Sequence, residues 1–142
     1  MSTLFTKIIN GEIPGRFIWK DESCVSFLTI GPLTDGHALV VPRLEVDKWT
    51  DAAPELVAKL MAVSQTIGQA QLSAFGAPRA GLIVAGFEVE HLRVHVFPAY
   101  GLENFDFKAV DNNPDPAAMD ASAEKIRVAL RAAGHGEFVP ES

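Results

Sequence analysis

The residues best suited to chemistry lie in one short stretch, residues 91–98, which reads His-Leu-Arg-Val-His-Val-Phe-Pro. In a β-strand successive side chains point to opposite faces, so His91, Arg93 and His95 would share one face, about 6.5 Å apart in consecutive pairs. The opposite face, toward the core, would carry Leu92, Val94 and Val96. The planar guanidinium of Arg93 suits phosphate oxygens, and a histidine on either side can donate or accept a hydrogen bond. The pattern therefore predicts a small pocket for an anion.

Two other interpretations of this stretch remain open at the level of sequence. Alternation of apolar and polar residues is typical of any antiparallel sheet with one solvated face. A shared metal ion is disfavoured, because His91 and His95 would lie about 13 Å apart along a strand. The chain also has one cysteine, Cys24, so no second thiolate can complete a tetrahedral zinc site.

Composition and charge limit what kind of protein this is. The chain has 142 residues, of which 48% are hydrophobic and 21% charged, which is typical of one globular domain spanning residues 1–142. A net charge of -6 is not that of a protein that binds duplex nucleic acid. The single cysteine excludes an internal disulfide and indicates a reducing compartment, so we expect a cytoplasmic protein. Neither a membrane span nor an export signal is evident, since apolar runs such as residues 82–87 are short.

Turn residues and apolar periodicity divide the chain into about five strands and two helices. We expect antiparallel pairing within the first hairpin and between the last two strands, which gives a mainly antiparallel α+β fold. Residues 101–114 are polar and irregular and are expected to pack as an extended arm. The expected strands are 16–19, 25–28, 37–41, 82–85 and 92–97, and the expected helices are 54–75 and a C-terminal one that begins at Asp115-Pro116 and stops at Gly134.

Three blocks of this sequence resemble the histidine triad (HIT) superfamily. Residues 91–97 are similar to its signature His-x-His-x-His-x-x, in which x is apolar, with His91 and His95 matching the outer histidines. Residues 5–14 are similar to the N-terminal block of the family, and residues 32–42 match its run P-x-x-x-G-H-x-L-V-x-P. The resemblance covers roughly residues 3–100, in the right order and spacing.

The resemblance implies a five-stranded antiparallel sheet with one long helix and a C-terminal helix, usually in a homodimer. It implies a purine nucleoside monophosphate or its phosphoramidate, ester or dinucleotide as ligand, and no cofactor. Carried over by position, His37 and His95 contact the phosphate side and His91 orients the site. Thr29 stands where many members carry an aspartate on the ribose hydroxyls, and it can make only one such hydrogen bond. The base pocket would be formed by Phe5, Ile8, Phe27 and Ile30, for which plain core packing is the alternative.

Arg93 is the main departure from the family pattern. In the family the central histidine attacks the α-phosphate and forms a nucleotidyl-histidine, and Arg93 stands at that position. A guanidinium stays protonated and has no lone pair with which to attack. We therefore expect a chain that binds a nucleotide phosphate and lacks the covalent chemistry of the family at a normal rate. The alternatives are an active phosphoramidate or dinucleotide hydrolase that uses another nucleophile or direct water attack, and a dimeric scaffold without ligand.

Two smaller departures concern metal binding and the loop before the triad. Zinc-binding members carry C-x-x-C at positions that here hold Thr3 and Thr6, so we expect that zinc site to be absent. The loop of residues 86–90 lacks the usual polar donors, and Glu88 would repel phosphate unless it pairs with Arg93. A solvated loop charge is the simpler interpretation of Glu88 and Glu90.

Overall fold

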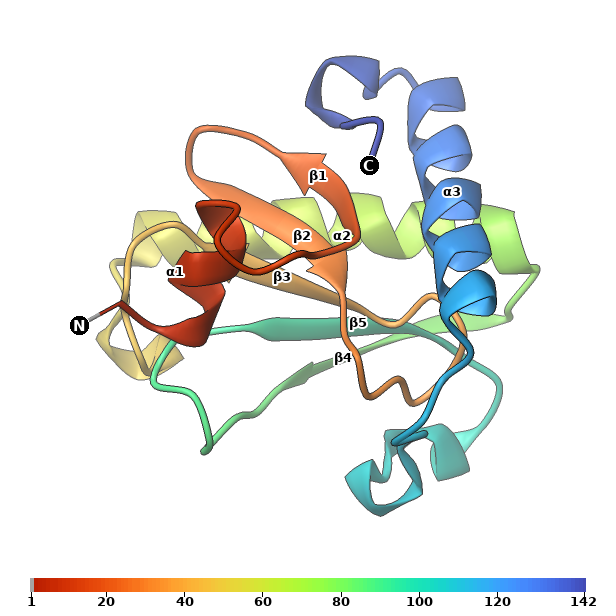
Figure 1. Ribbon diagram of the computed structural model, residues 1–142, viewed down its shortest axis with the longest axis horizontal. Helices are drawn as coiled ribbons and strands as arrows, with labels where there is room; N and C mark the ends of the chain where they lie inside the picture. The colour runs from red at the N-terminus through yellow and green to blue at the C-terminus, as the bar shows by residue number, and fades with distance from the viewer. Residues whose placement is uncertain (1) are drawn as a thin grey trace.

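The computed structural model describes residues 2–142 and contains one antiparallel sheet with strand order β1-β2-β3-β5-β4 (Figure 1). This confirms the predicted fold, a five-stranded antiparallel sheet with one long helix and a C-terminal helix. The strands are β1 (Phe17–Lys20), β2 (Cys24–Leu28), β3 (Ala38–Pro42), β4 (Arg79–Val84) and β5 (Val94–Ala99). The α-helices are α1 (Leu4–Ile9), α2 (Pro54–Phe75) and α3 (Pro116–Ala132).

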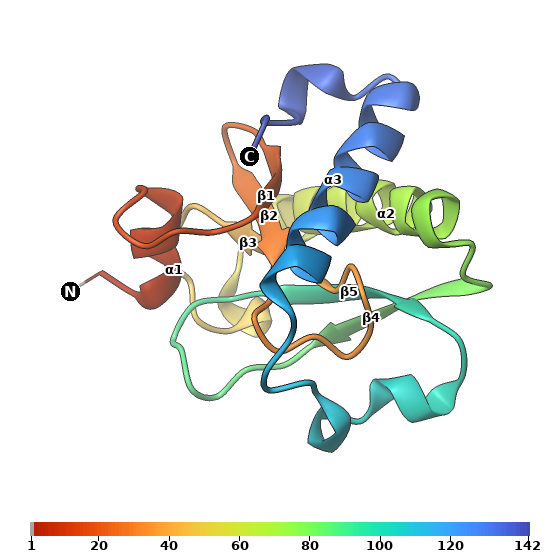
Figure 2. The same ribbon diagram turned by 45° about the vertical axis from the view of Figure 1, so that its right-hand side comes forward.

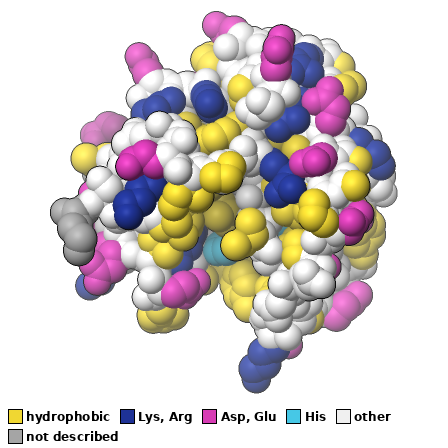
Figure 3. All heavy atoms as spheres, in the orientation of Figure 1, with side chains coloured by type: hydrophobic (Ala, Val, Ile, Leu, Met, Phe, Trp, Pro, Cys, Tyr) yellow, Lys and Arg dark blue, Asp and Glu magenta, His cyan; other side chains and the backbone are white. Residues whose placement is uncertain are grey.

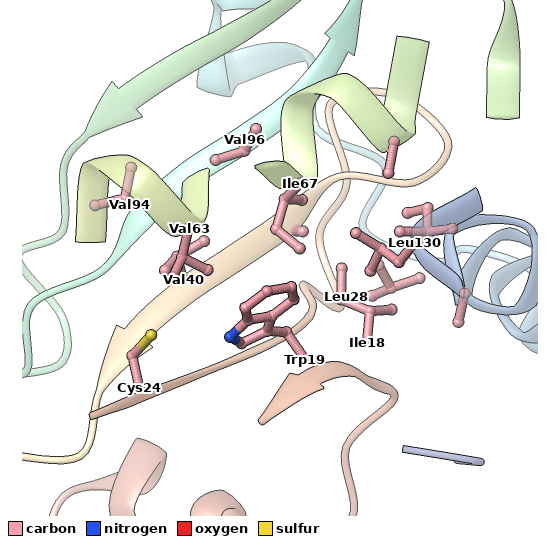
Figure 4. Close-up of a cluster of buried hydrophobic side chains, with 14 of the residues drawn as sticks. Ile18, Trp19, Cys24, Leu28, Val40, Val63, Ile67, Val94, Val96 and Leu130 are labelled. Atoms are coloured by element: carbon pink, nitrogen blue, oxygen red, sulfur yellow. The ribbon is translucent and has the colours of Figure 1, made fainter. Parts of the chain in front are cut away.

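The long helix α2 has the bounds that its sequence predicts, for the expected reasons. Pro54 occupies its first turn, where the missing amide proton costs nothing, and Gly76 ends it in the left-handed conformation at φ 64°. Its apolar stripe packs on one face of the sheet together with α3, which crosses the same side of the molecule (Figure 2). Figure 4 shows part of this core, in which Ile67 of α2 lies among Val40, Val96 and Leu130.

The opposite face of the sheet carries a second, smaller cluster of buried side chains beneath α1. It consists of Phe5, Phe17, Val25, Phe27, Leu39 and Val41. Because side chains alternate along a strand, each of β2 and β3 contributes to both faces and both strands are buried throughout. The small helix α1 therefore covers only part of a face that would otherwise be open.

Asp21 fixes the first hairpin, in the turn that the sequence predicts between β1 and β2. Its carboxylate accepts hydrogen bonds from the amides of Ser23 and Cys24 and from the Trp19 indole, and Lys59 Nζ lies 3.1 Å away. Burial alone would raise the pKa of Asp21, but these hydrogen bonds outweigh it and lower the value to about 2. The turn therefore holds an ionised carboxylate across the neutral range.

Three details differ from the sequence-based expectations. Helix α1 was not predicted, although Phe5, Ile8 and Ile9 have helical spacing and Thr3 caps the first turn. Residues 101–114 form two 3₁₀ turns, Leu102–Phe105 and Phe107–Ala109, rather than an extended arm. Strand β5 begins at Val94, so His91 and Arg93 precede the ladder. No helix within residues 2–142 is long and apolar enough to cross a membrane.

Candidate functional site

One pocket of about 400 Å³ lies between α1, the end of β2 and the start of β5. Arg93, His95 and Glu88 line it together with apolar residues, so a hydrophobic slot adjoins a polar end that contains a guanidinium and a carboxylate. Figure 3 shows a hollow lined largely by hydrophobic side chains, with a histidine visible inside it. The pocket lining includes all five residues that the resemblance assigns to the base and ribose, namely Phe5, Ile8, Phe27, Thr29 and Ile30.

Phe5 connects the apolar and basic parts of the pocket. Its ring meets the Phe27 ring edge to face at 5.8 Å and the His91 ring at 5.7 Å. The guanidinium carbon of Arg93 lies 5.0 Å from the centre of the same ring, a cation–π distance. Thr29 also lines the pocket, and its hydroxyl accepts a hydrogen bond from the Gly31 amide.

His37 and His95 belong to one directional chain of hydrogen bonds. The Leu33 amide donates to His37 Nδ1 at 2.9 Å, so the ring proton of His37 must be on Nε2. That nitrogen donates to His95 Nδ1 at 3.0 Å, which places the His95 proton on Nε2. His95 Nε2 in turn donates to the Ala85 carbonyl oxygen at 3.0 Å. The backbone at both ends thus fixes one tautomer for each imidazole.

His91 is fixed in the same tautomer by different partners. Its Nε2 donates to the Pro42 carbonyl oxygen at 2.7 Å, and its Nδ1 accepts from the Thr3 hydroxyl at 2.7 Å. Both nitrogens of His37, His91 and His95 therefore have a partner within the chain, and none of the six ring nitrogens faces the pocket unengaged.

Burial keeps the three imidazoles neutral at physiological pH. Desolvation, with the charge of His95 second, lowers the pKa of His37 to about 3. Desolvation also lowers the pKa of His91 and of His95, and the charge of Arg93 acts in the same direction on both. A neutral His95 can complete its hydrogen-bond chain, whereas a protonated one would place two N–H groups against each other unless His37 reoriented.

Arg93 holds the loop that joins β4 to β5. Its Nη1 donates to the carbonyl oxygens of Val89 and His91 at 2.9 and 2.8 Å, and its Nη2 lies 3.5 Å from Glu88 Oε1. Only 5% of the Arg93 side chain is exposed, whereas 80% of the Glu88 side chain is. Arg93 and Glu88 are thus within ion-pair distance, but Glu88 remains largely in solvent, in agreement with its simpler interpretation as a solvated loop charge. Burying the guanidinium requires these acceptors, since an uncompensated charge would be expensive.

Gly86 allows the loop to approach the guanidinium closely. A Cβ atom at this position would lie 2.0 Å from Arg93 Nη2, so a larger residue would displace the side chain. Glu88 itself is held by the Phe87 amide at 3.0 Å; this hydrogen bond, with the Arg93 charge as a smaller cause, lowers the pKa of Glu88. The loop of residues 86–90 is thus folded around Arg93.

Two residues at the site were not identified from the sequence. Glu45 accepts hydrogen bonds from Thr3 and Thr6 at the start of α1. Phe107, in the second 3₁₀ turn, meets the His95 ring edge to face at 4.9 Å. Neither residue can be recognised from its neighbours in the sequence, because each contacts a residue more than ten positions away in the chain.

Thr3 and Thr6, where the resemblance places the cysteines of zinc-binding members, have hydroxyls that are committed to hydrogen bonds. Zinc prefers thiolate, imidazole and carboxylate ligands, so this pair does not match the C-x-x-C ligands of such a site. Within residues 2–142, no group of three or more histidine, cysteine, aspartate or glutamate side chains is arranged to hold a metal ion.

Comparison with known proteins agrees with this architecture. The sequence profile of the HIT domain matches residues 10–102, about two thirds of the chain. The chain belongs to the HIT family. An uncharacterized HIT-like protein of Methanocaldococcus jannaschii is 35% identical over 103 residues, which cover 68% of this chain and 78% of that protein. A zinc-bound histidine triad family protein from Mycobacterium smegmatis has a similar structure, with 30% identity and a TM-score of 0.81 over 96% of this chain and 98% of that one.

Two relatives of this HIT protein have names that state an activity on nucleotides. Adenylylsulfatase HINT3 of Arabidopsis thaliana is 31% identical over 67% of this chain and 51% of its own length. Adenosine 5'-monophosphoramidase HNT1 of Saccharomyces cerevisiae is 29% identical over 67% of this chain and 61% of its own length. This chain thus spans about half to two thirds of these two relatives.

The buried neutral histidines predict that acid destabilises the fold. Because the pKa of His37 falls from 6.5 to about 3 on folding, the unfolded chain binds more protons between these values. The stabilisation is complete above about pH 6.5 and declines as the pH falls toward 3. We expect His37→Gln to reduce the slope of unfolding free energy against pH between 4 and 6 by up to about 1.4 kcal/mol per pH unit, measured by urea unfolding. Equal slopes in both proteins would contradict the neutral assignment of His37.

Proposed function

We propose that this HIT protein binds a purine nucleoside monophosphate or a close derivative, with the base in the slot between α1 and β2 and the phosphate at Arg93. The main support for this proposal is that the buried guanidinium of Arg93 and a set of apolar side chains line the same pocket of about 400 Å³. Arginine is well suited to the phosphate, because its planar fork of donors matches phosphate oxygens. The names of the two relatives that act on adenylyl compounds support the ligand class.

We further propose that Arg93 occupies the place of the central triad histidine, and that the chain lacks covalent nucleotidyl transfer at a normal rate. Nucleophilic attack on phosphorus needs a lone pair, and a guanidinium offers none. His95 is a poor substitute, because its Nε2 donates to Ala85 and its Nδ1 accepts from His37. In this proposal His37, His91 and His95 shape and hold the site instead of reacting.

The slot is also proposed to discriminate weakly between bases. The side chains that α1 and the segment after it contribute to the slot are apolar, so they can stack on a ring but cannot read its donors and acceptors. These residues are Leu4, Phe5, Ile8, Ile13 and Pro14. Thr29 can donate its hydroxyl proton to one ribose hydroxyl while its oxygen continues to accept from the Gly31 amide.

Binding measurements test the proposal directly. By isothermal titration calorimetry we expect AMP and GMP to bind with affinities within about fivefold of each other. Arg93→Gln should weaken AMP binding roughly 10- to 100-fold, because it removes a charged hydrogen-bond donor worth about 1.5–3 kcal/mol. Glu88→Gln should tighten binding, since the phosphate no longer competes with a carboxylate for Arg93.

Glu90→Gln is the matched control for the loop, because it makes the same charge change two residues away. It should leave the AMP affinity within about twofold of the unmodified chain. If the unmodified chain binds neither AMP nor GMP at millimolar concentration, the nucleotide proposal is wrong and a dimeric scaffold without ligand is favoured.

Turnover distinguishes a binding protein from an active hydrolase. We expect the unmodified chain to hydrolyse adenosine 5'-phosphoramidate at least 100-fold more slowly than Arg93→His, in which a side chain with a lone pair returns to the central position. Ammonia release followed over time measures both rates. Equal rates in the two proteins would show that another nucleophile or direct water attack operates, and would favour the phosphoramidate or dinucleotide hydrolase.

A homodimer formed through the edge strand β4 is also proposed. Strand β4 pairs with β5 on one side, and the sheet order leaves it at the edge. Exposed apolar side chains accompany this edge: Leu82 and Val84 on β4 are each 39% exposed and Met61 on α2 is 46% exposed. Unpaired strand edges next to apolar surface favour association with a second chain.

We place the protein in the cytoplasm, because Cys24 is buried and unpaired.

Sedimentation equilibrium tests the dimer. The unmodified chain should sediment at twice its chain mass of 15.3 kDa. Met61→Glu should give a monomer, because it puts a charge in the middle of the apolar surface beside β4. Val128→Glu on α3, which is 55% exposed away from this edge, should remain a dimer. A monomeric unmodified chain would contradict the proposal.

A further inference from the structure

We propose that Thr3, Thr6, Glu45 and His91 form a latch that holds α1 over the nucleotide pocket and so positions the wall against which the base stacks. The latch is a set of positioning residues, and its role in binding rests on the function proposed above. None of its members except His91 belongs to the histidine triad signature.

Glu45 is the centre of the latch. Its Oε1 accepts a hydrogen bond from the Thr3 amide at 3.0 Å and another from the Thr6 hydroxyl at 2.5 Å. Glu45 lies in the segment between β3 and α2, more than 38 residues from either threonine. One carboxylate oxygen, on a solvent-exposed side chain, therefore connects the first turn of α1 to a segment remote in sequence.

Thr3 connects this carboxylate to the triad. Its hydroxyl donates to His91 Nδ1 at 2.7 Å and accepts from the Thr6 amide at 3.1 Å, which caps the helix. His91 in turn contacts the sheet, because its Nε2 donates to the carbonyl oxygen of Pro42 in β3. The result is a continuous set of hydrogen bonds that runs from Glu45 through Thr6 and Thr3 to His91 and β3.

Helix α1 depends on such external bonds, because six residues are too few for a stable isolated helix. Phe5 is its buried side chain, packed against Phe27 and His91. Ile8 and Ile9 are partly buried against the same cluster, so the apolar side of the helix is already attached to the sheet. The latch adds a hydrogen-bonded attachment at the N-terminal end of the helix.

The position of α1 decides whether the pocket has its full depth. Leu4, Phe5 and Ile8 of this helix all line it, opposite Phe27 and Leu39 of the sheet. Phe5 also covers the guanidinium of Arg93 at 5.0 Å. If α1 moved away, the base would lose one of the two walls of its slot, and Arg93 would become exposed to solvent. Both changes would weaken the binding of a nucleoside monophosphate.

Hydrogen exchange of the ligand-free protein tests the latch separately from binding. In Glu45→Ala and in Thr6→Val we expect the amides of residues 7–10 to exchange at least tenfold faster than in the unmodified chain, while amides of β3 and β5 keep their protection. Thr6→Ser retains the hydroxyl and should restore slow exchange. Glu12→Ala removes an exposed carboxylate just after α1 and is the matched control, with exchange unchanged.

Calorimetric titration with AMP then tests the positioning role. Glu45→Ala and Thr6→Val should weaken AMP binding at least fivefold, and Thr6→Ser and Glu12→Ala should bind as the unmodified chain does. Unchanged exchange of residues 7–10 in Glu45→Ala would overturn the latch. Faster exchange with unchanged AMP affinity would overturn its role in positioning. If the unmodified chain does not bind AMP, the proposed function fails, and the exchange data alone still decide whether the latch exists.

Discussion

The site is built around the permanent positive charge of Arg93, a residue that is only 5% exposed to solvent. Burying a guanidinium is tolerable only when its donors find acceptors and its neighbours carry no further positive charge. The carbonyl oxygens of Val89 and His91 satisfy the first condition. The second is met because burial lowers the pKa of the three nearby histidines. The loop conformation, the tautomers and the close approach of Gly86 are all compatible with that one charge.

The sheet brings together groups that are far apart in the chain. Because β3 pairs with β5, His37 comes within a hydrogen bond of His95, 58 residues later. The same pairing leaves one sheet face to α2 and α3 and the other to α1, so the pocket forms on the less covered face. The pocket of about 400 Å³ thus depends on the pairing of strands that are distant in the sequence.

Elements with strong local signals were predicted well, and elements that depend on distant contacts were not. Pro54, Gly76 and a regular apolar stripe define α2 without help from the rest of the fold. Helix α1 was missed because it is short and owes its stability to Glu45 and His91, which lie far away in sequence. The stretch around His91 was expected to be a strand, yet the side chain of Arg93 folds the backbone before β5 into a loop. Arg93 and His95 nevertheless line the pocket together, and His91 lies against the Phe5 ring, which also lines it.

Periodicity and turn chemistry, which are local properties of the chain, predicted an α+β fold and its two main helices, and the resemblance to the HIT family predicted which residues line the pocket. Tertiary structure decided how those residues are used. It fixed the ring proton of His37, His91 and His95, gave both ring nitrogens of each a partner within the chain, and closed the loop of residues 86–90 around Arg93. Hydrogen-bond direction depends on which carbonyl or amide lies opposite each nitrogen, and only the packing of β3, β5 and α1 against one another sets that.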